Sequence, residues 1–173
     1  MSNLRLINET EITSTVSSVD VQNVFSSDYD IYKITVAINE SSAGNQEWIR
    51  LRLINSSGSI ITASEYDYAL YVMNSNASFY ETRNTNQSAD SYSGIGYADD
   101  TGNGGTMYVF NPYNNSSYTF MIAQSGSSVG TVLYANKGIS VHKSTEIITG
   151  INFHTIQSWG SGIIRTYGLR VDS

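Results

Sequence analysis

Two histidines, His142 and His154, are the side chains best suited to hold a metal ion or to transfer protons near neutral pH. A histidine acts as a metal ligand when carboxylates converge on it in three dimensions, and twelve residues separate this pair along the chain. We expect the two histidines at the surfaces of different strands, and therefore no metal site. The chain contains no cysteine, which excludes thiolate catalysis, disulfides and a cysteine-based zinc site.

Other arrangements that could do chemistry are incomplete. The segment 99–105, DDTGNGG, places carboxylates beside a glycine turn, but it lacks the alternating ligands and the closing glutamate of an EF-hand, so we interpret it as an ordinary acidic turn. No GxSxG element presents a nucleophilic serine. A glycosidase needs two carboxylates, and nothing in the sequence selects a pair. We therefore expect no enzymatic activity and no cofactor. The carboxylates considered are Glu47, Glu65, Asp67, Glu81, Asp90, Asp99 and Glu146.

Aromatic and arginine side chains form the stronger functional signal. An exposed aromatic ring can stack on a sugar, and Tyr, Trp and Arg are also enriched in subunit interfaces. The same rings can belong to the core or its rim, so core packing, an oligomer interface and sugar binding all remain open. The interface or ligand candidates are Trp48, Arg50, Arg52, Tyr92, Tyr97, Tyr113 and Trp159.

The composition narrows the class of protein. Of the 173 residues, 40% are hydrophobic and only 14% are charged. The length suits a single domain over residues 1–173, and the charged share lies below the roughly 25% of an ordinary soluble domain. The net charge of −6 argues against nucleic-acid binding, which needs clustered Lys and Arg. Because the opening MSNLRLINETEI has no apolar core, we expect no signal peptide, and no apolar run is long enough to cross a membrane.

An alternation with a period of two residues runs along most of the chain and predicts β-strands. In segment 30–38, DIYKITVAI, alternate residues from Tyr32 to Ile38 share one side. Segment 47–55, EWIRLRLIN, has the same pattern. Its inward side comprises Ile49, Leu51 and Leu53, and the side that we expect to face solvent or a partner comprises Trp48, Arg50 and Arg52.

Turn-forming clusters of Gly, Asn, Asp and Ser separate these strands at intervals of about 8–12 residues, which is typical of antiparallel sheets. Segment 74–105 is rich in Ser, Asn and Gly, and we expect long loops with one weak strand there. We predict an all-β fold, an antiparallel β-sandwich that is jelly-roll-like, with an eight-stranded closed barrel as the alternative.

Residues 104–124, GGTMYVFNPYNNSSYTFMIAQ, have the pattern of a β-hairpin. Two apolar runs flank a polar stretch that holds the single proline of the chain, Pro112. Because proline cannot donate to a β-ladder, we place Pro112 in the turn. The alternation leads us to predict Val109, Phe120 and Ile122 in the core. Since the segment contains no His, Cys, Asp, Glu, Lys or Arg, we expect its role to be structural.

Stretches from nearly the whole chain resemble small virion structural proteins of tailed bacteriophages, most closely those of phages that infect marine cyanobacteria. The resembling stretches are MSNLRLINETEIT, VFSSDYDIYKITV, LRLINSSGSIITASEYDYA, GGTMYVFNPYNNSSYTF and GSGIIRTYGLRVDS. Region 74–100 matches no pattern of this kind. The matching motifs are Asp30-Ile31-Tyr32, Leu51-Arg52-Leu53, Tyr66-Asp67-Tyr68, Gly105-Thr106, Asn111-Pro112 and Tyr167-Gly168.

The resemblance implies a β-sandwich subunit of a virion, assembled in the host cytoplasm and bound to other virion proteins, either the major capsid protein or tail proteins. With no heptads and no shaft, a capsid decoration (cement) protein is favoured. The alternative is a tail-fibre or appendage adhesin that binds a host-surface glycan. The low charge, the many tyrosines and the face carrying Trp48 further lead us to expect a homo-oligomer, with a trimer favoured. We expect neither nucleic acid nor a membrane as a partner.

Overall fold

The computed structural model describes residues 3–38, 47–76, 79–90, 95–98 and 102–170. This part of the chain forms β-strands and contains no helix, which confirms the all-β prediction. The described residues accordingly include no helix that could span a membrane.

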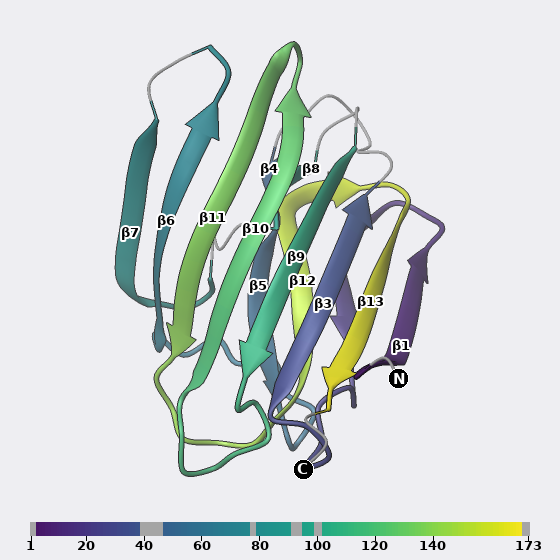
Figure 1. Cartoon of the computed structure of the whole chain (residues 1–173), viewed down its shortest axis with the longest axis vertical. Helices are drawn as coiled ribbons and strands as arrows, with labels where there is room; N and C mark the ends of the chain where they lie inside the picture. The colour runs from purple at the N-terminus through teal and green to yellow at the C-terminus, as the bar shows by residue number, and fades with distance from the viewer. Residues whose placement is uncertain (1–2, 39–46, 77–78, 91–94, 99–101, 171–173) are drawn as a thin grey trace.

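The larger sheet has eight strands, and every neighbouring pair in it is antiparallel. It forms the front layer in Figure 1, with β1 and β7 as its two edge strands. In spatial order its strands are β1 (Leu4–Ile12), β13 (Gly162–Leu169), β3 (Ile31–Ile38), β9 (Asn103–Phe110), β10 (Thr119–Val129), β11 (Val132–His142), β6 (Tyr66–Asn74) and β7 (Tyr80–Gln87).

A second, three-stranded sheet lies behind the first and completes a jelly-roll-like antiparallel sandwich (Figure 1). Its order is β2 (Val16–Val21), β12 (Ile148–Trp159) and β5 (Arg50–Asn55). The short strands β4 (Glu47–Trp48) and β8 (Tyr97–Ala98) pair with each other. The larger sheet is open at its two edges, so the alternative of a closed barrel is wrong.

The hydrophobic core lies between the two sheets. Alternate residues of β3 are buried there, as the sequence predicts, and so are the three inward residues of segment 47–55. A second apolar cluster lies beside β6, with Trp48 and Tyr134 packed against it. The two predicted sets are Tyr32, Ile34, Val36 and Ile38, and Ile49, Leu51 and Leu53; the second cluster is Tyr68, Leu70 and Val72.

The predicted hairpin exists as β9 and β10, but its sides are only partly as predicted. Val109 is buried and Pro112 lies in the connecting loop, which confirms both predictions. Phe120 and Ile122 are 47% and 41% exposed, so their prediction as core residues is wrong. The physical reason is the register, which pairs Val109 with Met121 and so turns Met121 inward and its neighbours outward.

Segment 74–105 contains more pairing than the sequence predicts. Its one long strand, β7, is the expected weak strand and forms an edge of the larger sheet. The segment also supplies β8, which pairs with β4, and a bridge from Asp90 to Leu51. The acidic stretch Asp99–Thr101 lies outside the described residues.

Candidate functional site

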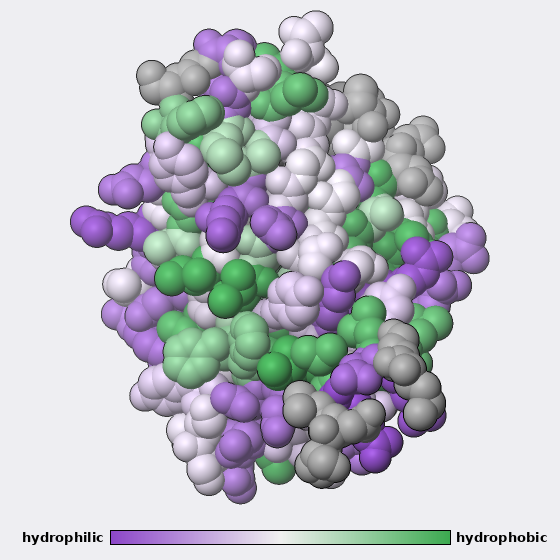
Figure 2. Space-filling model, in the orientation of Figure 1, coloured by the Kyte–Doolittle hydropathy of each residue, from purple (hydrophilic) through white to green (hydrophobic). Residues whose placement is uncertain are grey.

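The outward side of the eight-stranded sheet is a broad face against which none of the described strands packs (Figures 1 and 2). Strand alternation sends one set of side chains into the sandwich and the other set onto this face. The ladder registers show which outward side chains lie opposite one another. They group into rows that cross the sheet from β1 to β6.

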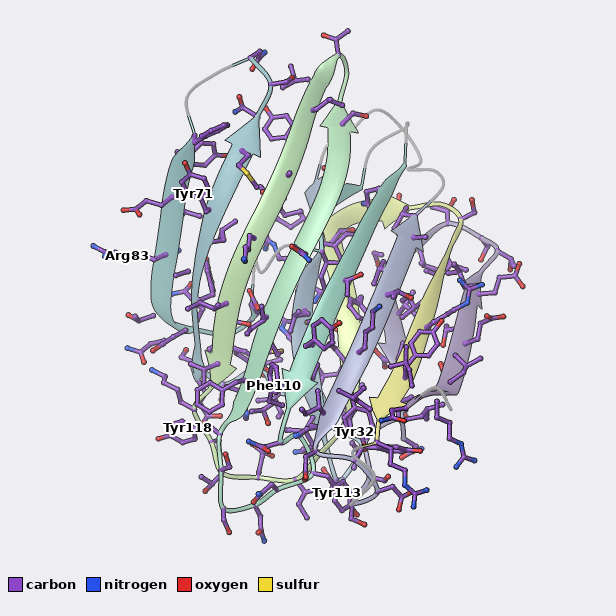
Figure 3. The ribbon with its side chains drawn as sticks, in the orientation of Figure 1. Tyr32, Tyr71, Arg83, Phe110, Tyr113 and Tyr118 are labelled. Carbon is purple, nitrogen blue, oxygen red and sulfur yellow. The ribbon has the colours of Figure 1, made fainter. Side chains whose placement is uncertain are left out.

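The first of these rows is entirely apolar over six neighbouring strands. It lies at the level of Phe110, which Figure 3 labels at the end of β9. Phe110 and Phe120 face each other across the hairpin, and the row ends at Asp67 on β6. We call it the first apolar row; it consists of Leu4, Leu169, Ile31, Phe110, Phe120 and Val141.

A second apolar row runs beside the first. One cation, Lys33, interrupts it, and the row continues on β6 and β7 with Ala69 and Arg83. Ile139 is 58% exposed and Tyr108 is 36% exposed, so the row is open to contact. Hydrophobic residues cross the lower half of this face in Figure 2. The second apolar row consists of Leu6, Tyr167, Lys33, Tyr108, Ile122 and Ile139.

The next row is polar and carries both signs of charge. Glu9 and Arg165 form an ion pair at 2.6 Å at one end of this row. At its other end Tyr71 lies between Lys137 and Glu81. The intervening residues are Thr35, Thr106 and Gln124.

An open hollow of about 530 Å³ lies on the β6 side of the same face. Tyr71 forms one wall, and its ring meets that of Phe79 edge-on at 5.8 Å between centroids. Figure 3 shows Arg83 extending from β7, next to the Tyr71 strand. The polar and apolar groups that line the hollow include Tyr71, Glu81, Arg83, Lys137 and Ile139.

The structure separates the members of the predicted face Trp48, Arg50 and Arg52. Trp48 is half-buried and packs against the cluster of Tyr68, Leu70 and Val72, and whether the rest of its ring contacts a partner stays a prediction.

The two arginines lie on the three-stranded sheet, opposite residues of β12. Arg50 pairs with His154 and Arg52 pairs with Asn152, and Arg52 Nε donates a hydrogen bond of 3.0 Å to the carbonyl oxygen of Ser88. Burial, reinforced by the charges of Arg52 and Arg50, lowers the pKa of His154 to about 4. His154 is therefore neutral at physiological pH, which suits its place beside two cations.

The remaining predicted candidates do not gather into one site among the described residues. Tyr97 pairs with Trp48 through the backbone, and Trp159 pairs with Val16. Tyr113 is 39% exposed in the β9–β10 loop (Figure 3). Tyr92 lies outside the described residues. Whether any of these side chains binds a ligand or a subunit stays a prediction.

Sequence reasoning missed the residues that dominate the outward face. The sequence analysis predicts Phe120 and Ile122 in the core and makes no prediction for Ile139. One signal could have shown that the hairpin has an apolar outward side. The two hairpin strands are apolar on both sides, whereas a strand with one wet side alternates between apolar and polar residues. A strand that is apolar on both sides therefore marks its outer side as a candidate contact surface.

Comparisons with known proteins add little to this geometry. No protein-family model and no curated protein sequence matches the chain. Among solved structures, the chain is similar to the marine PL-14 alginate lyase from Aplysia kurodai, at 8% identity and a TM-score of 0.34, over 95% of this chain and 82% of the lyase. It is also similar to a mutant of the alginate lyase Aly36B in complex with alginate trisaccharide, at 10% identity and a TM-score of 0.25, over 96% and 88%.

TM-scores this low establish neither a shared activity nor a shared ligand. The expectation that this chain is not an enzyme therefore stays a prediction.

Proposed function

We propose that the chain is a bacteriophage virion structural protein that decorates the capsid and attaches to it through the two apolar rows of its outward face. The observation that supports this proposal is the continuity of the first apolar row across six strands. Contiguous exposed apolar surface of this kind marks protein interaction sites in soluble proteins. The resemblance to small virion proteins supplies the class of partner, another protein of the particle such as the major capsid protein.

The chemistry of the rows favours a protein surface over a sugar as the main partner. From Leu4 to Val141 the first apolar row offers no side-chain donor or acceptor. A glycan is covered with hydroxyl groups, and burying these against such a row would leave them without hydrogen bonds. A complementary apolar protein surface has no such cost, and the neighbouring polar row with both signs of charge would form the rim.

A homo-oligomer, with a trimer favoured, remains part of the proposal. One of its original reasons is weaker, because Trp48 packs within its own chain. The outward face supplies a different reason, since its apolar rows cross six strands and offer apolar surface to a neighbouring copy.

Copy number tests the location on the particle. We expect purified particles of a phage whose genome encodes the chain to contain about as many copies of it as of the major capsid protein. Quantitative mass spectrometry measures both copy numbers. A copy number close to that of tail-fibre proteins would favour the adhesin. Absence from the particle would contradict both assignments.

Two variants test the attachment surface. Phe120→Ser and Ile122→Ser should each weaken binding of the purified chain to capsids that lack it, as measured by co-sedimentation. Ile156→Ser is the matched control, because Ile156 is 67% exposed and lies on β12 in the other sheet. If the control loses binding and the two outward-face variants keep it, the capsid attaches elsewhere.

The hollow beside Tyr71 supports a second candidate function, the adhesin. A tyrosine ring beside Lys137, Arg83 and Glu81 combines a stacking surface with charged hydrogen-bonding groups, which is chemistry suited to a glycan. On this hypothesis Tyr71→Ala removes binding on a glycan array while Phe120→Ser leaves it intact. Retention of glycan binding in Tyr71→Ala would exclude the hollow as the glycan site.

A further inference from the structure

Three potential metal ligands converge where β6 begins and β11 ends, at the lower ends of these strands in Figure 1. They are Glu65, His142 and Glu146, and one ligand atom from each lies within 4.8 Å of the others. His142 Nε2 is 3.0 Å from Glu65 Oε2 and 3.9 Å from Glu146 Oε1. The convergence of carboxylates that a histidine needs to become a metal ligand is therefore present at His142.

His142 is held rigidly in this cluster. It is fully buried, so the expectation of a surface histidine is wrong for it. Its ring packs against Tyr66 at 5.0 Å between centroids. The backbone N–H of Lys143 donates to the carbonyl oxygen of Glu65 at 2.9 Å, which ties the two ligand-bearing segments together. A histidine held in place by the sheet loses little conformational entropy when an ion binds.

Two buried polar atoms near this cluster lack a hydrogen-bond partner in the described part of the chain. Among the described residues, neither His142 Nδ1 nor Thr119 Oγ1 has a hydrogen-bond partner, although both residues are fully buried. Thr119 lies directly opposite His142 in the β10–β11 ladder. Nε2, the other ring nitrogen, faces the Glu65 carboxylate, and these two atoms are the ones that a bound cation would join.

No lysine or arginine in the described part of the chain makes an ion pair with these two carboxylates. Lys143 is adjacent in sequence, but its ammonium binds Asp67 at 2.9 Å and the side-chain oxygen of Asn86 at 2.6 Å. Neighbouring carboxylates repel each other, and a bound cation would offset this repulsion.

We propose that Glu65, His142 and Glu146 bind a divalent transition-metal cation such as Zn²⁺. Zinc takes imidazole nitrogen and carboxylate oxygen at about 2.0–2.2 Å, so ligand atoms around a tetrahedral ion lie about 3.4 Å apart, between the 3.0 and 3.9 Å found here. Glu65 and Glu146 are 38% and 32% exposed, which gives the ion access and leaves a fourth position to water. The bound ion joins the β11–β12 connection to the start of β6.

The test uses the whole chain stripped with EDTA and titrated with ZnCl₂ in a calorimeter. We expect one Zn²⁺ per chain, with affinity reduced about tenfold or more in Glu65→Gln and in Glu146→Gln. Glu11→Gln is the matched control, because Glu11 is an exposed carboxylate on β1, and it should bind like the wild type. Both ligand variants change partly exposed groups, so they should fold even if a change at His142 does not.

A structural readout separates this site from binding elsewhere on an acidic surface. In a ¹H–¹⁵N NMR spectrum that detects histidine rings, Zn²⁺ should shift the ring signals of His142 and leave those of His154 unchanged. Absence of Zn²⁺ binding, equal binding by the wild type and both glutamine variants, or a shift of His154 instead of His142 would each overturn the proposal. The outcome is independent of the capsid proposal, since the three ligands lie outside the two apolar rows.

Discussion

Phe110 and Phe120 lie directly opposite each other on the outward side of the β9–β10 hairpin, one immediately before and one shortly after the connecting loop. Their pairing means that Val109 and Met121, one residue further along each strand, both point into the core. A single register thus decides which side of the apolar hairpin packs in the core and which side is exposed.

Neighbouring residues of β10 should therefore differ sharply when truncated. Met121→Ala should reduce the free energy of unfolding by about 2–5 kcal/mol, because it opens a cavity in the core. Phe120→Ala should reduce it by about 1 kcal/mol or less, the contribution of a cross-strand aromatic pair. Urea denaturation of the two variants and the wild type measures both losses in the free energy of unfolding. Equal losses would mean that the outward face is buried in the isolated chain.

The hydroxyl of Tyr66 should contribute measurably to the free energy of unfolding. It accepts a hydrogen bond from the N–H of Leu53 at 2.9 Å and donates to the carbonyl oxygen of Ile61 at 3.3 Å, in a fully buried position. Tyr66→Phe leaves both groups without this partner, so we expect a loss of about 1–3 kcal/mol in thermal or urea unfolding. Tyr71→Phe, at an exposed ring, is the control and should change the stability little.

Stability should fall as the pH falls from about 6.5 to about 4, partly because of His154. The folded protein keeps the pKa of His154 at about 4, whereas an unfolded histidine titrates near 6.5. Between these values the unfolded state takes up a proton that the folded state does not, so protonation favours unfolding. Melting temperatures measured across this range should decline less steeply in His154→Gln than in the wild type. Parallel curves would show that His154 contributes nothing to the dependence.

Gly150 should tolerate no side chain, because β12 passes very close to the end of β2. A Cβ atom at Gly150 would lie 2.5 Å from the carbonyl oxygen of Val21 and 3.0 Å from Gln22 Cα. We expect Gly150→Ala to cost about 1–3 kcal/mol in urea unfolding, the usual effect of overpacking. At Gly126 nothing lies within 4 Å of the same atom, so Gly126→Ala should be nearly neutral. A neutral Gly150→Ala would indicate that β2 moves aside.

Much of the fold could be predicted because many strands have one apolar and one mixed side. In β3, Tyr32 and Ile34 alternate with Lys33, and this alternation correctly predicts that Tyr32 and Ile34 are buried. The alternation fails as a guide in β9 and β10, where both sides are apolar and only the register of Val109 with Met121 decides.

The candidate sites were harder to predict because long-range pairing creates them. The first apolar row joins Leu4 to Leu169 and Phe110 to Phe120, and no local pattern contains those partners. The cluster at His142 likewise brings in Glu65 from 77 residues away in the sequence. The sequence identifies the condition for a metal site, which is that carboxylates converge on a histidine. Only the folded chain shows that two carboxylates lie close to His142.

The two edge strands of the larger sheet limit how copies of this protein can join. β7 exposes Glu81 and Arg83, and β1 exposes Arg5, Glu9 and Glu11, so charged side chains line both open backbone edges. Charges at such positions oppose the addition of a further strand from another chain. Endless ribbons of continuous sheet are therefore disfavoured, so a contact between copies has to use the faces of the sandwich and leave each copy a separate folded unit.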